Sequence, residues 1–126
     1  MGLDMFLACI KERETNEGDM KVSWKELYWR KANQIHNWFV QNIQNGYDDC
    51  DEYSLDAYDI LELRNDCAYV LKYPEEAEDV LPTVGGIFFG STDYGDWYWE
   101  EVERTLKELD EVLQEDYTKF YYKSSW

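Results

Sequence analysis

Hydrophobic residues recur at helical spacing most clearly over residues 24–44. Ser23 and Glu26 match a capping box at the start of this segment, and Gly46 follows its end, where a left-handed residue commonly stops a helix. The apolar positions lie three and four residues apart, on one helical face: Trp24, Leu27, Tyr28, Ile35, Trp38, Phe39 and Ile43. This pattern predicts a first helix over 24–44.

A second helix is predicted over 55–72, followed by a short one over 74–81. Ser54 or Asp56 can cap the second helix, and Pro74 ends it because a residue before proline avoids helical geometry. The apolar positions form a stripe and a wider set of neighbours: Leu55, Tyr58, Leu61, Ala68 and Leu71, then Ile60, Leu63, Cys67 and Val70. A helix with so much apolar circumference is expected to be central.

The last long helix is expected from Asp96 to about residue 116, and β structure is expected elsewhere. The apolar run 3–10 predicts a buried strand, and the polar segment 11–19 predicts a loop. Residues 83–92 combine glycines with apolar residues, which indicates a strand or extended loop that pairs with 3–10. The tail 117–126 either extends the helix or docks on the body.

Together these segments predict an α+β fold that is mostly helical. It has three main helices, one short helix and a small element of two or three strands. The 126 residues fit a single domain, 1–126. Aromatic residues make up 17% of the chain, which is more than one small core can hold, so some are expected to line a surface patch or groove.

Charge is distributed unevenly along the chain. The net charge is −16, and residues 48–116 contain 22 acidic and 4 basic residues. Such a charge disfavours direct contact with nucleic acid or anionic membranes and favours basic partners. The last helix offers only Arg104 and Lys107 as cations, although like charges such as Glu111 and Glu115 repel each other. We therefore predict an acidic partner-binding face: Asp48, Asp49, Asp51, Glu52, Glu100, Glu101, Glu103, Glu108, Glu111 and Glu115.

Aromatic and basic residues predict an alternative site. Aromatic side chains together with arginine and histidine can form a pocket for a small molecule or a peptide. The residues expected to line it are Tyr28, Arg30, His36, Trp97 and Trp99. His36 can also serve as a general base, but we favour a helix-surface or core-edge histidine with one hydrogen bond.

Motifs for catalysis, cofactors or metals are not evident. The glycines at 85, 86 and 90 fit neither a P-loop nor a dinucleotide fingerprint, and the acidic segment 48–52 lacks the glycine and glutamate of an EF-hand. The three cysteines are widely spaced and are expected to be reduced thiols. We expect no enzyme activity, no cofactor and no metal. A basic leader and a long apolar segment are lacking, which predicts a cytoplasmic protein.

Three stretches carry a resemblance to a known group of proteins. The opening GLDMFL, YWRKANQIHNWF at 28–39 and FFGSTDYGDWYWE at 88–100 resemble a family of small uncharacterised acidic proteins from phage and prophage genomes. The resemblance covers most of the chain except its tail, and it implies no catalytic residue. It implies a setting in which small acidic proteins act on host machinery.

The leading hypothesis from the sequence is a phage-encoded, non-enzymatic inhibitor. Its acidic face would mimic DNA and occupy the basic groove of a nucleic-acid-binding or defence protein of the host, as in anti-CRISPR or anti-restriction proteins, with a CRISPR nuclease among the candidate targets. The alternative is a domain that binds a small molecule or peptide in the aromatic, arginine and histidine pocket.

Overall fold

The computed structural model describes residues 2–126 and contains one four-stranded antiparallel sheet. Its strands are β1 (Asp4–Glu14), β2 (Met20–Arg30), β3 (Tyr53–Leu55) and β4 (Lys119–Ser125). They are arranged in the order β2-β1-β4-β3, so that β1 pairs with β2 on one side and with β4 on the other.

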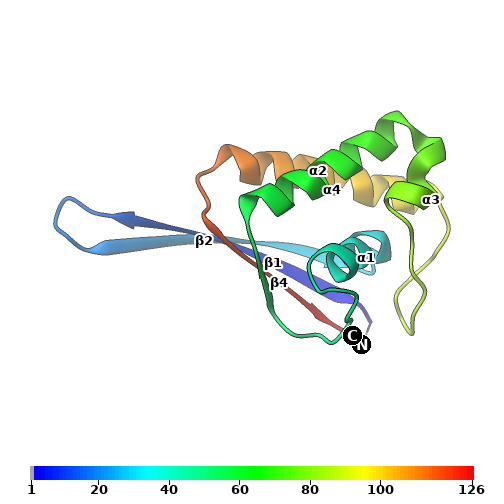
Figure 1. Cartoon of the computed structure of the whole chain (residues 1–126), viewed down its shortest axis with the longest axis horizontal. Helices are drawn as coiled ribbons and strands as arrows, with labels where there is room; N and C mark the ends of the chain where they lie inside the picture. The colour runs from blue at the N-terminus through cyan, green and yellow to red at the C-terminus, as the bar shows by residue number, and fades with distance from the viewer. Residues whose placement is uncertain (1) are drawn as a thin grey trace.

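The helices lie on one side of this sheet (Figure 1). They are α1 (Asn33–Asn42), α2 (Ala57–Lys72), the 3-10 turn η1 (Pro74–Glu76), α3 (Ala77–Val80) and α4 (Asp96–Gln114). The two long helices, α2 and α4, run alongside each other above the strands, and α1 sits between them and one end of the sheet (Figure 1).

The predicted fold class needs correction in its details. The fold is α+β, but the sheet has four strands instead of two or three, and the chain is not mostly helical. The helix layer has four α-helices and one 3-10 turn. Residues 83–92 form no strand, and the partners of β1 are β2 and β4. The tail does not extend α4 but docks on the body, because most of it becomes β4, which pairs with β1 and β3.

The predicted first helix is wrong over its first half. Residues 20–30 form β2, which pairs with β1 along eleven residues, and the helix begins only at Asn33. Leu27 and Trp29 are buried while Tyr28 between them is exposed, which is the period of a strand. The apolar residues in this segment fit both the helical and the strand period, and pairing with β1 selects the strand.

The two long helices agree better with the predictions made from the sequence. Asp56 caps α2, and a reciprocal bond with Asp59 completes a capping box. The buried face of α2 is narrower than predicted and excludes Tyr58 and Leu61, which are exposed. The buried residues are the four predicted as neighbours of the apolar stripe: Ile60, Leu63, Cys67 and Val70.

The core lies between the helices and the inner face of the sheet. Trp29 is fully buried there, and its indole N–H donates to Thr105 Oγ1 of α4 at 2.8 Å. Phe39 of α1 stacks on Tyr122 of β4 with ring centroids 3.8 Å apart. These contacts tie two of the helices and both neighbours of β1 into one packing unit.

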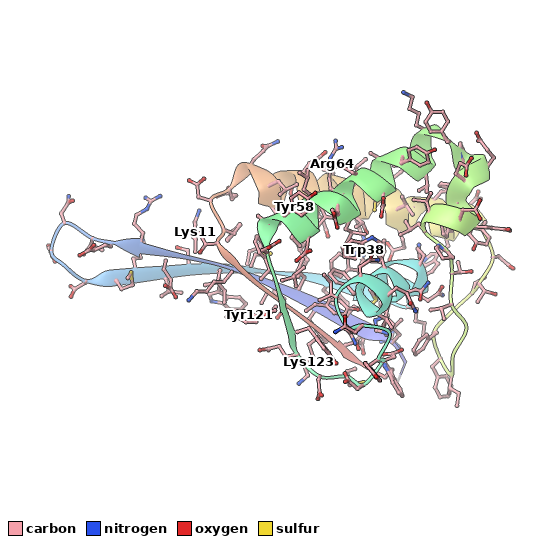
Figure 2. All side chains as sticks on the ribbon, in the orientation of Figure 1. Lys11, Trp38, Tyr58, Arg64, Tyr121 and Lys123 are labelled. Atoms are coloured by element: carbon pink, nitrogen blue, oxygen red, sulfur yellow. The ribbon has the colours of Figure 1, made fainter. Side chains whose placement is uncertain are left out.

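The opposite face of the sheet carries no helix (Figure 1). Aromatic side chains are exposed there, including Trp24 and Tyr28 of β2, in agreement with the expectation that the core cannot hold all of them. Figure 2 shows Tyr121 and Lys123 of β4 in the strand layer, away from Tyr58 and Arg64 of α2. Within residues 2–126, no helix has both the length and the apolar character to cross a bilayer.

Leucines 61 and 63 of α2 provide a matched test of this packing. Leu63 is fully buried, so we expect Leu63→Ala to lower the free energy of unfolding by about 2–5 kcal/mol. Leu61→Ala removes the same atoms from an exposed site and should change it by less than about 1 kcal/mol. Urea denaturation measures both, and equal losses would contradict the assigned helix face.

Candidate ligand-binding sites

Three segments of the chain meet where β2 ends and α1 begins. The backbone N–H of Lys31 donates to the carbonyl of Leu3 at 2.7 Å, and the N–H of Leu3 donates to the carbonyl of Phe88 at 3.2 Å. Beside this junction lies a cavity of about 470 Å³. We call it the Arg30 pocket; its lining residues are Arg30, Lys31, Gly90, Ser91, Trp97 and Glu101.

Lys31 adopts an unusual backbone conformation at the edge of this pocket. Its φ of 56° lies in the left-handed region, which lysine rarely adopts and which costs of order 1–3 kcal/mol. Gly90 packs against it so closely that a Cβ at position 90 would lie 3.0 Å from the Cβ of Lys31. Gly90 itself has a φ of 88°, so its lack of a side chain is needed both for space and for backbone geometry.

Asn33 holds the third segment in place. This residue is fully buried, and its side-chain N–H groups donate to the carbonyls of Phe89 at 3.0 Å and Ser91 at 2.9 Å. Its Oδ1 accepts from the backbone N–H of Val84 at 3.1 Å. One amide thus fastens both ends of the loop that faces the pocket, and no local sequence pattern indicates this role.

The charges around the Arg30 pocket are partly balanced. Arg30 donates to Asp4 at 3.0 Å. A hydrogen bond from Tyr28, and then the charge of Arg30, hold the pKa of Asp4 below its usual value. Glu101 pairs with Arg104 at 2.9 Å. Lys31, in contrast, has no ion pair with any residue that the structure describes.

The alternative pocket predicted from the sequence is assembled in part. Arg30 and Trp97 line the same cavity, and Tyr28 is linked to it through Asp4. Trp99 is not part of it, because it packs on Tyr98 with ring centroids 4.8 Å apart and its N–H donates to the carbonyl of Tyr94. His36 is also absent from the lining.

His36 lies in the core, not at its edge. Its Nδ1 is 2.6 Å from the hydroxyl of Tyr122, and its Nε2 is 2.9 Å from Asp48 Oδ1. Burial lowers the pKa of His36 below its usual 6.5, so the ring is neutral at pH 7. The tautomer that satisfies every partner has Nε2–H donating to Asp48 and Nδ1 accepting from Tyr122.

This histidine connects to a second cavity. The indole N–H of Trp126 donates to the same Asp48 oxygen at 2.9 Å. Asp48 and Trp126 then contribute to a cavity of about 270 Å³ at the surface, which we call the Asp48 pocket. Its other lining residues come from the loop that Asn33 fastens: Val84, Gly85, Gly86, Ile87 and Phe89.

The predicted acidic face is divided between two places. Residues 48–52 precede β3 near the C-terminus, whereas residues 100–111 lie on α4 in the helix layer and Glu115 follows the end of that helix (Figure 1). In the first group, Asp49 accepts from the Tyr53 hydroxyl at 2.6 Å, which lowers the pKa of Asp49 and raises the pKa of Tyr53 to about 12. Asp51 and Glu52 are exposed.

Most predicted carboxylates of α4 have cationic partners, and two of those partners come from the strands. Arg104 binds Glu101 and Glu108, but β1 and β2 supply further lysines. Lys11 contacts Glu115 at 2.9 Å and Lys25 contacts Glu111 at 3.8 Å. Arg64 of α2 contacts Asp110 of α4 at 2.7 Å (Figure 2 labels Lys11 and Arg64). The expectation that α4 has only Arg104 and Lys107 as partners is therefore wrong.

Exposed carboxylates without an ion pair remain at one end of the helix layer. The Tyr98 hydroxyl donates to the carbonyl of Leu81 at 2.7 Å and so links the start of α4 to the end of α3. We call this region the acidic end; its members are Glu75, Glu78, Asp79, Asp96, Glu100 and Glu103. Among residues 2–126, no group of three or more His, Cys, Asp or Glu side chains is arranged to hold a metal ion.

The buried histidine makes stability depend on pH in a definite window. Below 6.5 the unfolded chain binds a proton at His36, whereas the folded chain takes it up only at lower pH. We therefore expect the free energy of unfolding to fall as the pH drops below 6.5 toward the lowered pKa of the folded state, by at most about 1.4 kcal/mol per pH unit. Carboxylates with lowered pKa values, such as Asp4 and Glu115, change the free energy of unfolding only at more acidic pH.

Denaturation at a series of pH values, for the natural chain and for His36→Gln, measures this effect. Since His36 is the single histidine, the variant should lack the slope in that window even if it is less stable overall. An unchanged slope in His36→Gln would contradict the assignment.

Comparisons of the chain with protein-family models, curated proteins and solved structures find no match. The resemblance to phage proteins gains no support from them. Functional conclusions therefore rest on the geometry of residues 2–126.

Proposed function

We propose that this protein is a non-enzymatic binding protein whose Arg30 pocket takes a small anionic ligand with a planar group. The observation that carries this proposal is the position of Lys31. Its backbone is held in a strained conformation, and its side chain lines a cavity of about 470 Å³ without a carboxylate partner. Strain of this kind concentrates where a ligand or substrate is bound.

The pocket offers matched chemistry for such a ligand. Lys31 and Arg30 place two cations beside one another at the cavity, and the Lys31 ammonium can donate to a phosphate or carboxylate there. Trp97 is 37% exposed and lines the same cavity, so its ring can stack on a planar group. Two adjacent cations are a strong local feature in a chain with a net charge of −16.

The surroundings of the Ser91 hydroxyl in this pocket favour ligand binding over catalysis. Ser91 Oγ accepts a hydrogen bond from the backbone N–H of Asp93 at 3.0 Å. Among the described residues no histidine or carboxylate forms a hydrogen bond with that hydroxyl, which a serine nucleophile would need.

Adenosine 5′-monophosphate tests the proposal, because it joins a phosphate to a planar base. We expect it to bind more tightly than adenosine, measured by isothermal titration calorimetry. Lys31→Asn keeps a residue that tolerates the left-handed conformation but removes the charge. It should weaken binding roughly ten- to hundred-fold, the effect of losing one charge-assisted hydrogen bond.

Lys123→Asn is the matched control, because Lys123 is an exposed lysine of β4 outside the pocket. It should leave the affinity within about two-fold, since exposed charges at a distance are screened. Equal weakening by Lys31→Asn and Lys123→Asn, or equal affinity for the nucleotide and the nucleoside, would count against the pocket.

A second candidate function follows from the acidic end. Six exposed carboxylates there have no ion pair among the described residues, which favours contact with a basic groove. On this proposal the chain is a phage-encoded inhibitor in the host cytoplasm. It would mimic DNA on a nucleic-acid-binding or defence protein, of the anti-CRISPR or anti-restriction type, and it would not touch nucleic acid or membrane itself.

Charge reversal distinguishes this candidate. We expect the natural chain to recover a DNA-binding protein from bacterial lysate at about 0.1 M salt and not at about 0.5 M, because the screening length roughly halves. Added chain should also block DNA binding by the recovered protein. The pair Glu100→Lys and Glu103→Lys should abolish both effects.

The matched control for this pair is Asp51→Lys with Glu52→Lys, which changes the net charge equally at the other acidic group. That control should keep both effects. If both pairs act alike, net charge alone explains recovery and the acidic end is not a specific surface.

A further inference from the structure

The Asp48 pocket is a separate site whose chemistry is opposite to that of the Arg30 pocket. It lies on the other part of the loop that Asn33 fastens and shares no lining residue with the Arg30 pocket. One carboxylate, Asp48, lines it together with aromatic and aliphatic side chains. Ligand binding here is therefore independent of whether the Arg30 pocket takes an anion.

Asp48 is held in a fixed orientation by two N–H donors. The His36 ring and the Trp126 indole both donate to its Oδ1, each at 2.9 Å. His36 is itself fixed, because its other nitrogen accepts from the buried Tyr122 hydroxyl. Oδ2 of Asp48 forms no hydrogen bond within the described part of the chain, so it is available to a ligand.

Apolar side chains surround this carboxylate. The rings of Phe89 and Trp126 meet at 65° with centroids 6.0 Å apart, so they form two walls of one corner. Ile87 is 81% exposed and Trp126 is 52% exposed, although both line the cavity. Large apolar groups at a solvent-facing cavity are typical of a surface that a ligand covers.

We propose that the Asp48 pocket binds an alkylammonium group. The N–H donors of the cation would bind Asp48 Oδ2, and its positive charge would face the electron-rich ring of Trp126. The adjacent methylene groups would lie against Ile87 and Phe89. A cavity of about 270 Å³ has room for an ammonium head and a short alkyl chain.

Other ligand classes fit this pocket less well. An anion would meet Asp48 in a chain whose net charge is already −16. A neutral alcohol could donate one hydrogen bond to Asp48 but would lack the attraction of a charge for the aromatic ring and the carboxylate. The ammonium can come from a free amine or from a lysine side chain of a partner protein, and both present the same chemistry.

The first experiment uses the natural chain with n-pentylamine and 1-pentanol, which differ chiefly in charge. Binding is followed by the ¹H–¹⁵N resonance of the Trp126 indole, assigned by its loss in Trp126→Leu. We expect a saturable shift with the amine and an affinity at least ten-fold weaker for the alcohol. Equal affinities would overturn the proposal, because they would show a merely apolar pocket, and the lack of any shift with the amine would overturn it as well.

Two carboxylate variants in the same region separate specific binding from general attraction. Asp48→Asn keeps the acceptor for His36 and Trp126 but removes the charge, and it should weaken amine binding at least ten-fold. Asp51→Asn removes the same charge from an exposed residue outside the cavity and should change it less than two-fold. Equal weakening by both variants would overturn the proposal in favour of attraction to net charge.

Trp126→Leu keeps the test decisive if Asp48→Asn does not fold, because Trp126 is half exposed at the end of β4. Followed by calorimetry, it should also weaken amine binding, and undiminished affinity would overturn the proposal. Nα-acetyl-lysine methylamide then distinguishes the two sources. Tighter binding than n-pentylamine supports a lysine side chain, and weaker binding supports a free amine.

Discussion

The central position of β1 is the constraint on which the rest of this structure depends. It is the one strand with two long neighbours, and its pairing places Leu7 and Trp29 beneath the helices. The same register sets Asp4 opposite Arg30. Because β2 ends there and α1 begins at Asn33, the chain must turn sharply within two residues, and Lys31 takes the left-handed conformation at that turn.

One loop serves both candidate sites. Asn33 fastens it at Val84, Phe89 and Ser91, so its two parts are held on either side of a single buried amide. One part faces two cations and a tryptophan, and the other faces a carboxylate and a different tryptophan. The two pockets therefore favour ligands of opposite charge although they are supported by the same residue.

The distribution of charge changes once the chain is folded. Along the sequence α4 has few cations, but the hairpin of β1 and β2 brings Lys11 and Lys25 to its second half. The carboxylates without an ion pair are thus divided between the first half of α4 with α3 and the segment that precedes and begins α2, and they do not form a single surface over 48–116. Exposed ion pairs of this kind contribute little stability each, but they reduce the acidic area open to a partner.

The local sequence pattern was sufficient to predict the elements whose capping and periodicity are unambiguous. The cap at Asp56, the stop at Pro74 and the amphipathic periodicity from Asp96 to about residue 116 indicated α2 and α4. The apolar run 3–10 indicated the first part of β1, but residues 11–14, predicted to be a loop, continue the strand. The α+β class follows from these elements. Arg30 and Trp97 could also be anticipated as pocket residues, because arginine and tryptophan are suited to such sites wherever they are exposed.

Only the tertiary structure decided the rest, because it depends on contacts between distant residues. The segment 20–30 matches a helix and a strand almost equally, and eleven paired residues of β1 select the strand. Lys31 and Asn33 become functional candidates only when Gly90 and Ser91 are brought against them. What the sequence determined by itself is local periodicity and capping; pairing, burial and the ligand pockets require the folded chain.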